Sequence, residues 1–273
     1  MKEFRKISLL GCGLGGEVWA CLDKDGQLCA VKFFKQDLVS SRREVDNALA
    51  LNHPNIIHPL SYSLKEDNAY MVMPYLEGRS VDNIAGYVNE KTAWKLILDI
   101  ASALDYMHGK GLCHADVKPS NILYGGESFL LGDLGSCFGE GEKPLASDKS
   151  SYQFCAPEKK RSFGSDIWSL GASVFYLVMG VPVFGGLGGR AQKGESDIPI
   201  MRKSMPELSG CVKRCLDYSS QMRPSAAELM ALAREQLARC QALNLPRPLK
   251  AQAEPSVTDA NAAFWPETMT DTL

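Results

Sequence analysis

The chain has 273 residues and a formal net charge of −2; 45% of its residues are hydrophobic and 23% are charged. A chain of this size and composition can bury a large core, as one big domain or as two lobes. The nearly balanced charge argues against nucleic acid or an anionic membrane as the main partner, and no apolar run approaches the ~18 residues of a membrane span.

The N-terminal part of the chain shows the period-two alternation that is typical of strands. Strands are expected over residues 4–11, 17–22, 27–34, 57–63 and 69–75, and one helix is expected over 40–52. The sequence Asp-Lys-Asp-Gly at 23–26 predicts a hairpin turn. The apolar stretch near the N-terminus is too short for a signal peptide, so we interpret it as part of the first strand.

After Gly78 the pattern becomes helical. Seven apolar residues recur at intervals of three and four and predict a long amphipathic helix; they are Ala93, Leu96, Ile97, Ile100, Ala101, Leu104 and Met107. Residues 166–179 are apolar on nearly every side, so this helix is expected to be buried all round. Further helices are expected over 206–218 and 225–242.

Together these elements predict a compact α+β domain of two lobes over residues 1–244. A small antiparallel β-rich lobe with one helix covers about 1–75, a hinge lies near 74–80, and a larger, mainly helical lobe covers 81–244. Periodicity is lost from about Leu245, and we expect an extended or disordered tail over 245–273. In this tail Phe264-Trp265 is the one candidate docking point.

The cysteines indicate a reducing compartment. Nine are scattered along the chain, and the nearest pair, Cys211 and Cys215, has helical spacing with no histidine close by. This pattern favours buried, reduced thiols over a zinc site. We therefore expect a cytoplasmic location. Because the sequence shows no membrane span or sensor domain, delivery into a host cytosol as an effector is the alternative.

The run Gly11-Cys12-Gly13-Leu14-Gly15-Gly16 is a candidate phosphate-binding loop. Dinucleotide-binding folds use the same glycine spacing, and Asp37 lies where their acidic residue would be, but there a helix follows the last glycine. Here residues 17–22 form an alternating, strand-like run. This arrangement favours a glycine loop between two antiparallel strands that covers a nucleotide with its backbone N–H groups.

Lys32 lies in the strand after the hairpin turn, on the same face as Ala30 and Phe34. Alone, it would be interpreted as an ordinary solvated lysine. Glu44, on the helix expected over 40–52, can reach back to it. Such a pair would hold the lysine against the α- and β-phosphates of a nucleotide.

The strongest signal is the segment His114-Ala115-Asp116-Val117-Lys118-Pro119-Ser120-Asn121, followed by Asp133-Leu134-Gly135. Phosphoryl transfer needs a carboxylate that orients the attacking hydroxyl and accepts its proton, a cation beside the γ-phosphate, and oxygen ligands for Mg²⁺. Asp116, Lys118 and the pair Asn121 and Asp133 supply these groups in that order.

On these motifs the chain resembles the eukaryotic-type protein kinase family over about residues 4–240. Ala156-Pro157-Glu158 resembles the family's A-P-E motif, and the preceding residues 150–155 resemble its substrate-side loop. Residues 166–171 resemble the start of its buried central helix, and Arg223-Pro224 resembles the arginine that pairs with the A-P-E glutamate.

The resemblance implies an enzyme that uses ATP with Mg²⁺ or Mn²⁺ and phosphorylates a protein substrate. Lys118, two residues after Asp116, resembles the serine/threonine type rather than the tyrosine type. Ser151 would belong to the substrate-side loop, and Glu158 with Arg223 would form a structural pair.

The resemblance also implies which residues surround the nucleotide. The adenine would meet the backbone of Pro74 and Leu76, with Met73 at the back of the pocket. The ring would lie between the side chains of Val18, Ala30 and Leu123. Ser80 stands where a ribose-binding acid often lies.

Two departures from the family pattern affect the prediction. Ala115 replaces an arginine that commonly gathers a phosphorylated activation loop. We therefore expect activity that does not depend on phosphorylation of Ser147, Ser150 or Ser151. Residues 184–204 are glycine-rich where the family usually has a helix that helps to bind substrate, which leaves substrate docking open.

Alternative functions remain open from the sequence. A small-molecule phosphotransferase often has a small residue before its aspartate, as Ala115 is here, but would lack Lys118 in this register. A nucleotide-binding pseudokinase that acts as an interaction module would lack Lys32, Asp116 or Asp133, and none is missing. An adaptor role of the tail could coexist with catalysis. A monomer is the default expectation.

Overall fold

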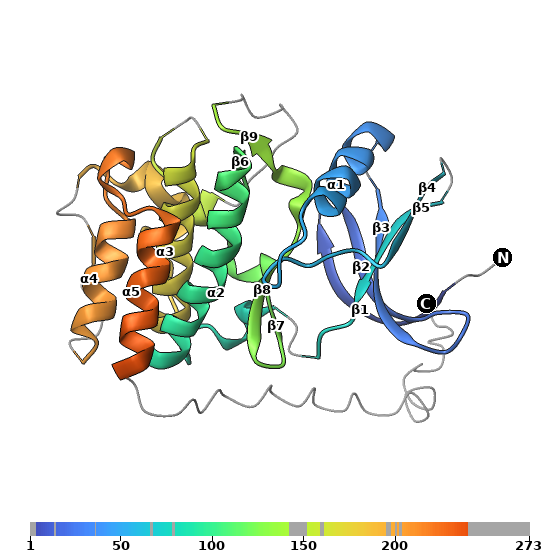
Figure 1. The fold of residues 1–273 in the computed structure, drawn as a ribbon, viewed down its shortest axis with the longest axis horizontal. Coiled ribbons are helices and arrows are strands. Elements are labelled where there is room, and N and C mark those ends of the chain that lie inside the picture. Colours follow the sequence, from blue (N-terminus) through green and yellow to red (C-terminus); the bar gives the residue numbers. More distant parts are fainter. Residues whose placement is uncertain are drawn as a thin grey trace, which may run out of the picture.

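The computed structural model describes residues 4–239, except 14, 36, 66–67, 78–79, 142–151, 159–160, 195–197, 200 and 202–203. The chain folds into a β-rich N-terminal lobe and a mainly helical C-terminal lobe (Figure 1). The α+β class and the two-lobe architecture expected from the sequence are confirmed.

The N-terminal lobe is built on an antiparallel sheet with the strand order β1-β2-β3-β5-β4. Its strands are β1 Arg5–Gly13, β2 Gly16–Leu22, β3 Leu28–Phe34, β4 Ser61–Lys65 and β5 Asn68–Pro74. Helix α1, Leu38–Ala50, packs beside β4 and β5 at the end of the lobe that faces the helical lobe (Figure 1). The lobe thus carries its helix next to the junction.

Asp23 builds the hairpin turn between β2 and β3. Its carboxylate accepts hydrogen bonds from the backbone N–H groups of Asp25, at 2.9 Å, and Gln27, at 2.8 Å. Gly26 has a φ of 78°, in the left-handed region that glycine adopts without strain. The predicted turn is confirmed, and it sets the register in which Val18 lies opposite Lys32.

The strand expected over 57–63 is wrong, because β4 begins only at Ser61. Ile57 is buried and donates its N–H to the carbonyl oxygen of Leu131 at 2.9 Å. This apolar residue therefore packs on the C-terminal lobe rather than in the sheet, a tertiary contact that alternation alone does not distinguish. Helix α1 begins at Leu38 rather than at 40, because Asp37 caps it by accepting the Ser40 N–H at 2.9 Å.

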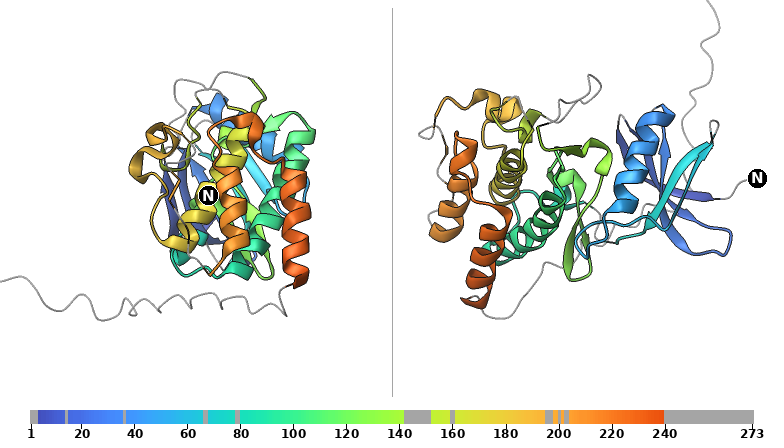
Figure 2. Two further views of the ribbon diagram at one scale, coloured as in Figure 1. Left: turned by 90° about the vertical axis from the view of Figure 1, so that its left-hand side faces the viewer. Right: turned by 45° about the horizontal axis from the view of Figure 1, so that its top comes forward.

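The described part of the C-terminal lobe contains the helices α2 Glu90–Gly109, α3 Phe163–Met179, α4 Pro206–Cys215 and α5 Ala226–Arg239. Helices α2 and α3 form its centre, and Trp94 and Trp168 are among their fully buried side chains. Helix α5 packs along α2, and α4 packs against α3 (Figure 2). The predicted burial of α3 on all sides is confirmed.

Several helix ends differ from the expected ones because polar side chains cap them. Helix α3 begins at Phe163, three residues early, since Ser162 and Ser165 exchange hydrogen bonds of 3.2 and 2.9 Å in a capping box. Helix α4 stops at Cys215, before a turn in which Asp217 accepts the Ser219 N–H at 2.8 Å. The expected end of the last helix at 242 and the predicted tail lie outside the described residues.

Short elements connect the lobes and line their junction. Strand β6, Leu112–Cys113, pairs with β9, Phe138–Gly139, and β7, Ile122–Gly125, pairs with β8, Ser128–Leu131. The 3₁₀ turns are η1 Val81–Ile84, η2 Pro119–Asn121, η3 Leu134–Ser136, η4 Tyr152–Phe154, η5 Gly185–Ala191 and η7 Ser220–Met222. The β7–β8 hairpin lies on the side of the helical lobe that faces the sheet (Figures 1 and 2).

In the described part of the chain, no helix is both long enough and apolar enough to cross a bilayer.

Candidate functional site

Lys32 joins the two lobes. It lies on β3 opposite Val18 of β2 and Met71 of β5, and only 8% of it is exposed. Its Nζ lies 2.5 Å from Glu44 Oε1 on α1 and 3.0 Å from Asp133 Oδ1 in the C-terminal lobe. Burial would lower the pKa of Lys32, but the two carboxylates outweigh it and raise that pKa well above its ordinary value. The ammonium group therefore stays charged.

Helix α1 is held against the segment Asp133-Leu134-Gly135 by two hydrogen bonds in addition to the Lys32 ion pairs. Arg43 donates to the Gly135 carbonyl oxygen at 2.8 Å, and Asn47 donates to the Leu134 carbonyl oxygen at 3.2 Å. A side chain at Gly135 would place its Cβ only 2.9 Å from Glu44 Oε2. The glycine thus gives the Glu44 carboxylate room to reach Lys32.

Asp133 has a backbone conformation that is rare for a residue with a side chain. Its φ of 59° and ψ of 72° are left-handed. Loss of water on the side that faces the protein would raise the pKa of Asp133, but the Lys32 ammonium lowers it below its ordinary value, so the carboxylate stays ionised. About 43% of its side chain is exposed, and its Oδ2 accepts no hydrogen bond from the described residues. A strained backbone thus aims a charged carboxylate at the junction of the lobes.

Asp116, Lys118 and Asn121 form a compact cluster in the loop between β6 and β7. Lys118 Nζ lies 2.6 Å from Asp116 Oδ2. The Asn121 side-chain amide donates to the Asp116 carbonyl oxygen at 2.9 Å and to its Oδ2 at 3.1 Å. Burial raises the pKa of Asp116, and Lys118 opposes that effect only in part. A carboxylate with a raised pKa is a better proton acceptor than an ordinary surface aspartate.

Asp166, on α3, holds the start of this loop through hydrogen bonds to its backbone. Its carboxylate is 1% exposed and accepts the backbone N–H of His114 and of Ala115, both at 2.8 Å. Ala115 is thereby kept at a φ of 65°, another left-handed position. His108 lies 3.0 Å from the same carboxylate and stacks on Phe163. A buried carboxylate therefore fixes the backbone that presents Asp116.

The sequence motif places Asp166 at the start of the central helix but does not reveal its positioning role. The sequence does contain a signal for such a role. An aspartate near the start of an otherwise apolar, fully buried helix needs hydrogen-bond donors from elsewhere in the fold. Which donors these are depends on the tertiary structure.

The glycine run forms the end of the β1–β2 hairpin. Gly13 pairs with Gly16, and a Cβ at Gly16 would lie 2.1 Å from the Phe33 carbonyl oxygen, so only glycine fits there. The residues Gly11, Cys12 and Gly13 are exposed, and Gly15 accepts the Lys35 N–H at 3.2 Å. Leu14 lies outside the described residues. The loop is therefore a strand-to-strand turn, as predicted, and not the start of a helix.

The residues expected around an adenine come from both lobes. Val18 and Ala30 lie on β2 and β3, and Ala30 is paired with Met73 on β5. Leu123 on β7 forms an isolated bridge with Ser80. Pro74 ends β5, and the side chain of Leu76 lies close to Gly125 of β7. The structure thus brings the β5–η1 connection alongside β7.

Glu158 and Arg223 form a bidentate ion pair. Arg223 Nη1 lies 2.6 Å from Glu158 Oε1, and its Nη2 lies 2.8 Å from Oε2. The guanidinium also donates to the carbonyl oxygens of Gly164 and Asp217, both at 2.8 Å. The pair ties the segment ahead of α3 to the turn after α4. Ser151, expected in the substrate-side loop, lies outside the described residues.

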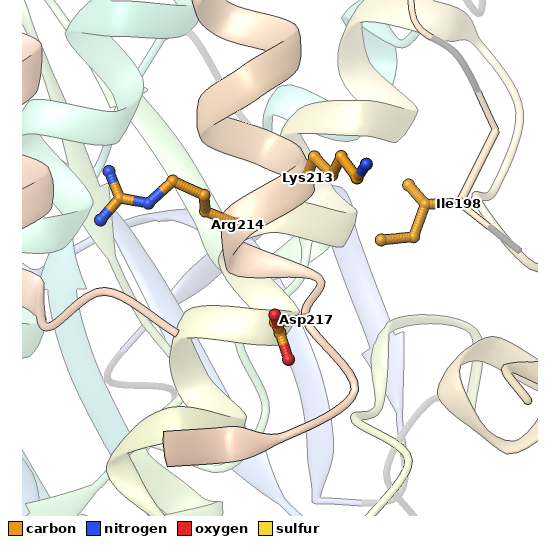
Figure 3. A pocket seen from close by; sticks show the side chains of 4 residues that line it. All are labelled: Ile198, Lys213, Arg214 and Asp217. Carbon is orange, nitrogen blue, oxygen red and sulfur yellow. The ribbon is translucent and has the colours of Figure 1, made fainter. Parts of the chain in front are cut away.

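A separate hollow of about 190 Å³ lies at the end of α4 and is lined by Ile198, Lys213, Arg214 and Asp217 (Figure 3). It is smaller than the about 300–1,000 Å³ of typical small-molecule sites. Asp217 is already used in the turn after α4, and Arg214 points away from Lys213 (Figure 3). The hollow is thus small, and part of its lining already belongs to the turn after α4.

Comparison with known proteins agrees with this geometry. Residues 4–233 match the family described as Protein kinase domain. An Aurora kinase of Saccharomyces cerevisiae is 32% identical over 209 residues, which cover 67% of this chain and 57% of the relative. A probable serine/threonine-protein kinase of Dictyostelium discoideum is 31% identical over 201 residues, covering 68% and 40%.

A third relative, MAP3K epsilon protein kinase 1 of Arabidopsis thaliana, is 28% identical over 245 residues, covering 81% of this chain and 18% of its own length. The chain spans about half the length, 57% and 40%, of the first two relatives.

Proposed function

The chain belongs to the protein kinase family, and from that membership and the geometry of its site we propose that it transfers the γ-phosphate of ATP to a serine or threonine hydroxyl of a protein. The observation that carries the proposal is the ion-paired Lys32 ammonium, held between Glu44 and Asp133 at 2.5 and 3.0 Å. This contact joins the lobes at the place where a nucleotide's phosphates would be bound.

Asp116 is proposed as the group that orients the acceptor hydroxyl and takes its proton. The hydroxyl oxygen forms a bond to the γ-phosphorus, the bond to the bridging oxygen breaks, and ADP leaves with that electron pair. The raised pKa of Asp116, caused by burial, suits a proton acceptor. Lys118, 2.6 Å from Asp116, places a positive charge where the transferred phosphoryl group would pass.

Lys32 is proposed to bind the α- and β-phosphates of ATP, with Glu44 as its positioning partner. The exposed backbone of Gly11, Cys12 and Gly13 would cover the phosphates together with the tip, Leu14 and Gly15, and with Gly16. The remaining nucleotide contacts are proposed for the residues gathered from both lobes: Val18, Ala30, Met73, Pro74, Leu76, Ser80 and Leu123.

Asn121 and Asp133 fit a role as the protein's ligands for Mg²⁺ or Mn²⁺. The side-chain nitrogen of Asn121 donates to Asp116, and its side-chain oxygen, Oδ1, could therefore face a cation. The Asp133 Oδ2 accepts no hydrogen bond from the described residues. Carboxylate and amide oxygens suit Mg²⁺, which takes one or two protein ligands and binds mainly through substrate phosphates and water. When bound, the ion supplies charge that offsets that of the phosphates.

The proposed activity does not require phosphorylation of the loop that contains Ser147, Ser150 and Ser151. Support comes from the way the catalytic loop is held. Asp166 fixes the backbone N–H groups of His114 and Ala115 directly, and the Ala115 side chain has no charge with which to gather a phosphate. Replacing the three serines by alanine is expected to leave the rate of phosphate transfer within about two-fold of the wild type, since Ala115 offers no charge to a phosphate on this loop. Loss of transfer with an unchanged melting temperature would overturn this point.

The proposed substrate is a protein, and the proposed location is the cytoplasm, of the producing cell or of a host. The test is incubation with ATP, Mg²⁺ and a cell lysate, followed by phosphosite mass spectrometry, with Lys32→Ala and Asp133→Asn as controls. New phosphoserine or phosphothreonine sites that depend on both residues are expected. Transfer only to metabolites would instead indicate a small-molecule phosphotransferase, and nucleotide binding with no transfer would indicate an interaction module.

A further inference from the structure

The 3₁₀ turn η5 packs directly on the backbone of residues 152–157. Gly189 donates its N–H to the Cys155 carbonyl oxygen at 2.8 Å. A Cβ at Gly188 would lie 2.0 Å from the Tyr152 carbonyl oxygen, and one at Gly189 would lie 2.4 Å from the Pro157 nitrogen. Gly188 also has a φ of 52°. The glycines of η5 therefore permit a close backbone contact with the segment ahead of Glu158.

This contact places Arg190 over Tyr152. The guanidinium carbon lies 3.8 Å from the centre of the tyrosine ring, which is a close cation–π contact. Both residues are exposed, Tyr152 by 46%. Within the described part of the chain, Arg190 has no hydrogen bond or ion pair to a carboxylate. Its position is thus held by stacking while its N–H donors are left available.

Two other stacked arginines provide a contrast. Arg43 and Arg161 lie over the Phe138 ring at 4.5 and 5.0 Å. Each also donates to the protein, Arg43 to the Gly135 carbonyl oxygen and Arg161 to the Ser136 carbonyl oxygen. Those two guanidinium groups serve the fold, whereas that of Arg190 faces outward without such an acceptor among the described residues.

We propose that Arg190 is a specificity-determining residue that binds an anionic side chain of the protein substrate, either a carboxylate or a phosphate. The inference rests on the proposed function, because Tyr152 lies in the segment 150–155 that is proposed to face the substrate. A guanidinium presents a planar fork of donors that matches carboxylate and phosphate groups. Stacking on Tyr152 orients this fork in advance, which reduces the entropy lost on binding.

The inference can be tested by peptide binding, which does not require phosphate transfer. Fluorescently labelled serine peptides are titrated with the full chain in ADP and Mg²⁺, with aspartate, phosphoserine or alanine scanned through each position beside the acceptor serine. We expect an acidic or phosphorylated residue at one position to tighten binding about three- to ten-fold over alanine. A larger gain with phosphoserine than with aspartate assigns a phosphate as the ligand, and the reverse assigns a carboxylate.

Substitutions distinguish the role of the Arg190 guanidinium from that of the Tyr152 ring beneath it. Arg190→Ala should bind the anionic and alanine peptides equally, and Arg190→Glu should prefer lysine at the same position. Tyr152→Phe should keep the preference because it keeps the ring. Arg234→Ala, which removes an exposed arginine on α5, is the matched control and should behave as wild type.

Equal affinity of wild type for anionic and alanine peptides would overturn the inference, as would an unchanged preference in folded Arg190→Ala. A binding preference that depends on Arg190 but is accompanied by no phosphate transfer would contradict the proposed function and leave this inference intact. Efficient transfer to anionic and neutral peptides at equal rates would support the proposed function and contradict the inference about Arg190.

Discussion

Glu44 is the residue whose neutralisation tests the lysine pair most cleanly. Its carboxylate is 1% exposed, and its Oε1 lies 2.5 Å from Lys32 Nζ. Glu44→Gln preserves shape but removes the charge that holds the ammonium in place. We expect kcat/KM for ATP to fall about 10²-fold, because the lysine loses its fixed direction toward the phosphates.

Steady-state kinetics measures this effect, and Glu235→Gln on the exposed side of α5 is the matched control. A fall of less than two-fold in Glu44→Gln, with Glu235→Gln unchanged, would contradict the role given to the pair.

The environment of Asp116 predicts how the rate of phosphate transfer depends on pH. Burial raises its pKa above the ordinary value for an aspartate, and only the deprotonated form accepts a proton. As pH falls, the rate should therefore begin to drop at a higher pH than a surface carboxylate would give. The measurement is kcat/KM for the protein substrate against pH, with substrate ionisation controlled by a peptide without acidic side chains. An acid limb at or below the ordinary aspartate range would contradict this environment for Asp116.

At the scale of elements, Gly135 sets how closely α1 approaches the segment after β8. A methyl group there would meet Glu44 Oε2 at 2.9 Å, so the carboxylate whose other oxygen contacts Lys32 would have to shift. Gly135→Ala should therefore reduce kcat/KM for ATP about ten-fold, with a smaller effect on melting temperature.

Gly210→Ala on α4 is the matched control, because the position has open space around it and lies in a helix, where alanine is favoured. If Gly135→Ala were as active as Gly210→Ala, the close fit of α1 would not matter for nucleotide binding.

Glu158 and Arg223 couple the segment ahead of α3 to the turn after α4. Arg223 is buried and makes hydrogen bonds to that carboxylate and to the carbonyl oxygens of Gly164, Asp217 and Tyr218. Arg223→Met leaves Glu158 without its cation, and breaking such a pair typically costs about 3–5 kcal/mol of folding free energy.

Chemical denaturation measures this loss, and Arg234→Met serves as the surface control. A loss below about 1 kcal/mol for Arg223→Met would show that the pair is not structural.

The elements that sequence alone predicted well are those with strong local signals. The β2–β3 hairpin follows from Asp23 and Gly26, and the buried helix α3 follows from its apolar faces. The shift of β4 was not predictable, because Ile57 has the pattern of a strand but is used against Leu131. Register between segments distant in the chain depends on contacts that no local pattern contains.

For the molecule as a whole, the residues of the candidate site could be predicted from the sequence. Phosphoryl transfer restricts the types of residue that can take part and the order in which this family places them along the chain. Lys32, Glu44, Asp116 and Asp133 were each expected, and the structure brings Lys32, Glu44 and Asp133 into contact across the lobes. The identity of the backbone N–H groups that Asp166 binds, and the stacking of Arg190 on Tyr152, could not be predicted. The first depends on the burial of Asp166 beneath His114 and Ala115. The second depends on the close backbone contact between the glycines of η5 and residues 152–157.

The two lobes also explain why a nucleotide should stabilise the chain. Its proposed contacts come from β2, β3 and β5 on one side and from β7 on the other, so binding would tie the lobes together. A ligand that binds only the folded state stabilises it by RT ln(1 + [L]/Kd), so the melting temperature rises with the logarithm of the ligand's excess over Kd.

The most direct test of the central claim combines that shift with phosphate transfer, for wild type and Asp116→Asn, at saturating ATP and Mg²⁺ with a protein substrate. We predict that ATP raises the melting temperature of both proteins. Wild type should transfer the γ-phosphate to serine or threonine, and Asp116→Asn should do so at least about 10²-fold more slowly. Stabilisation of wild type by ATP without any transfer, or equal transfer by both proteins, would contradict the claim that this chain is a protein kinase acting through Asp116.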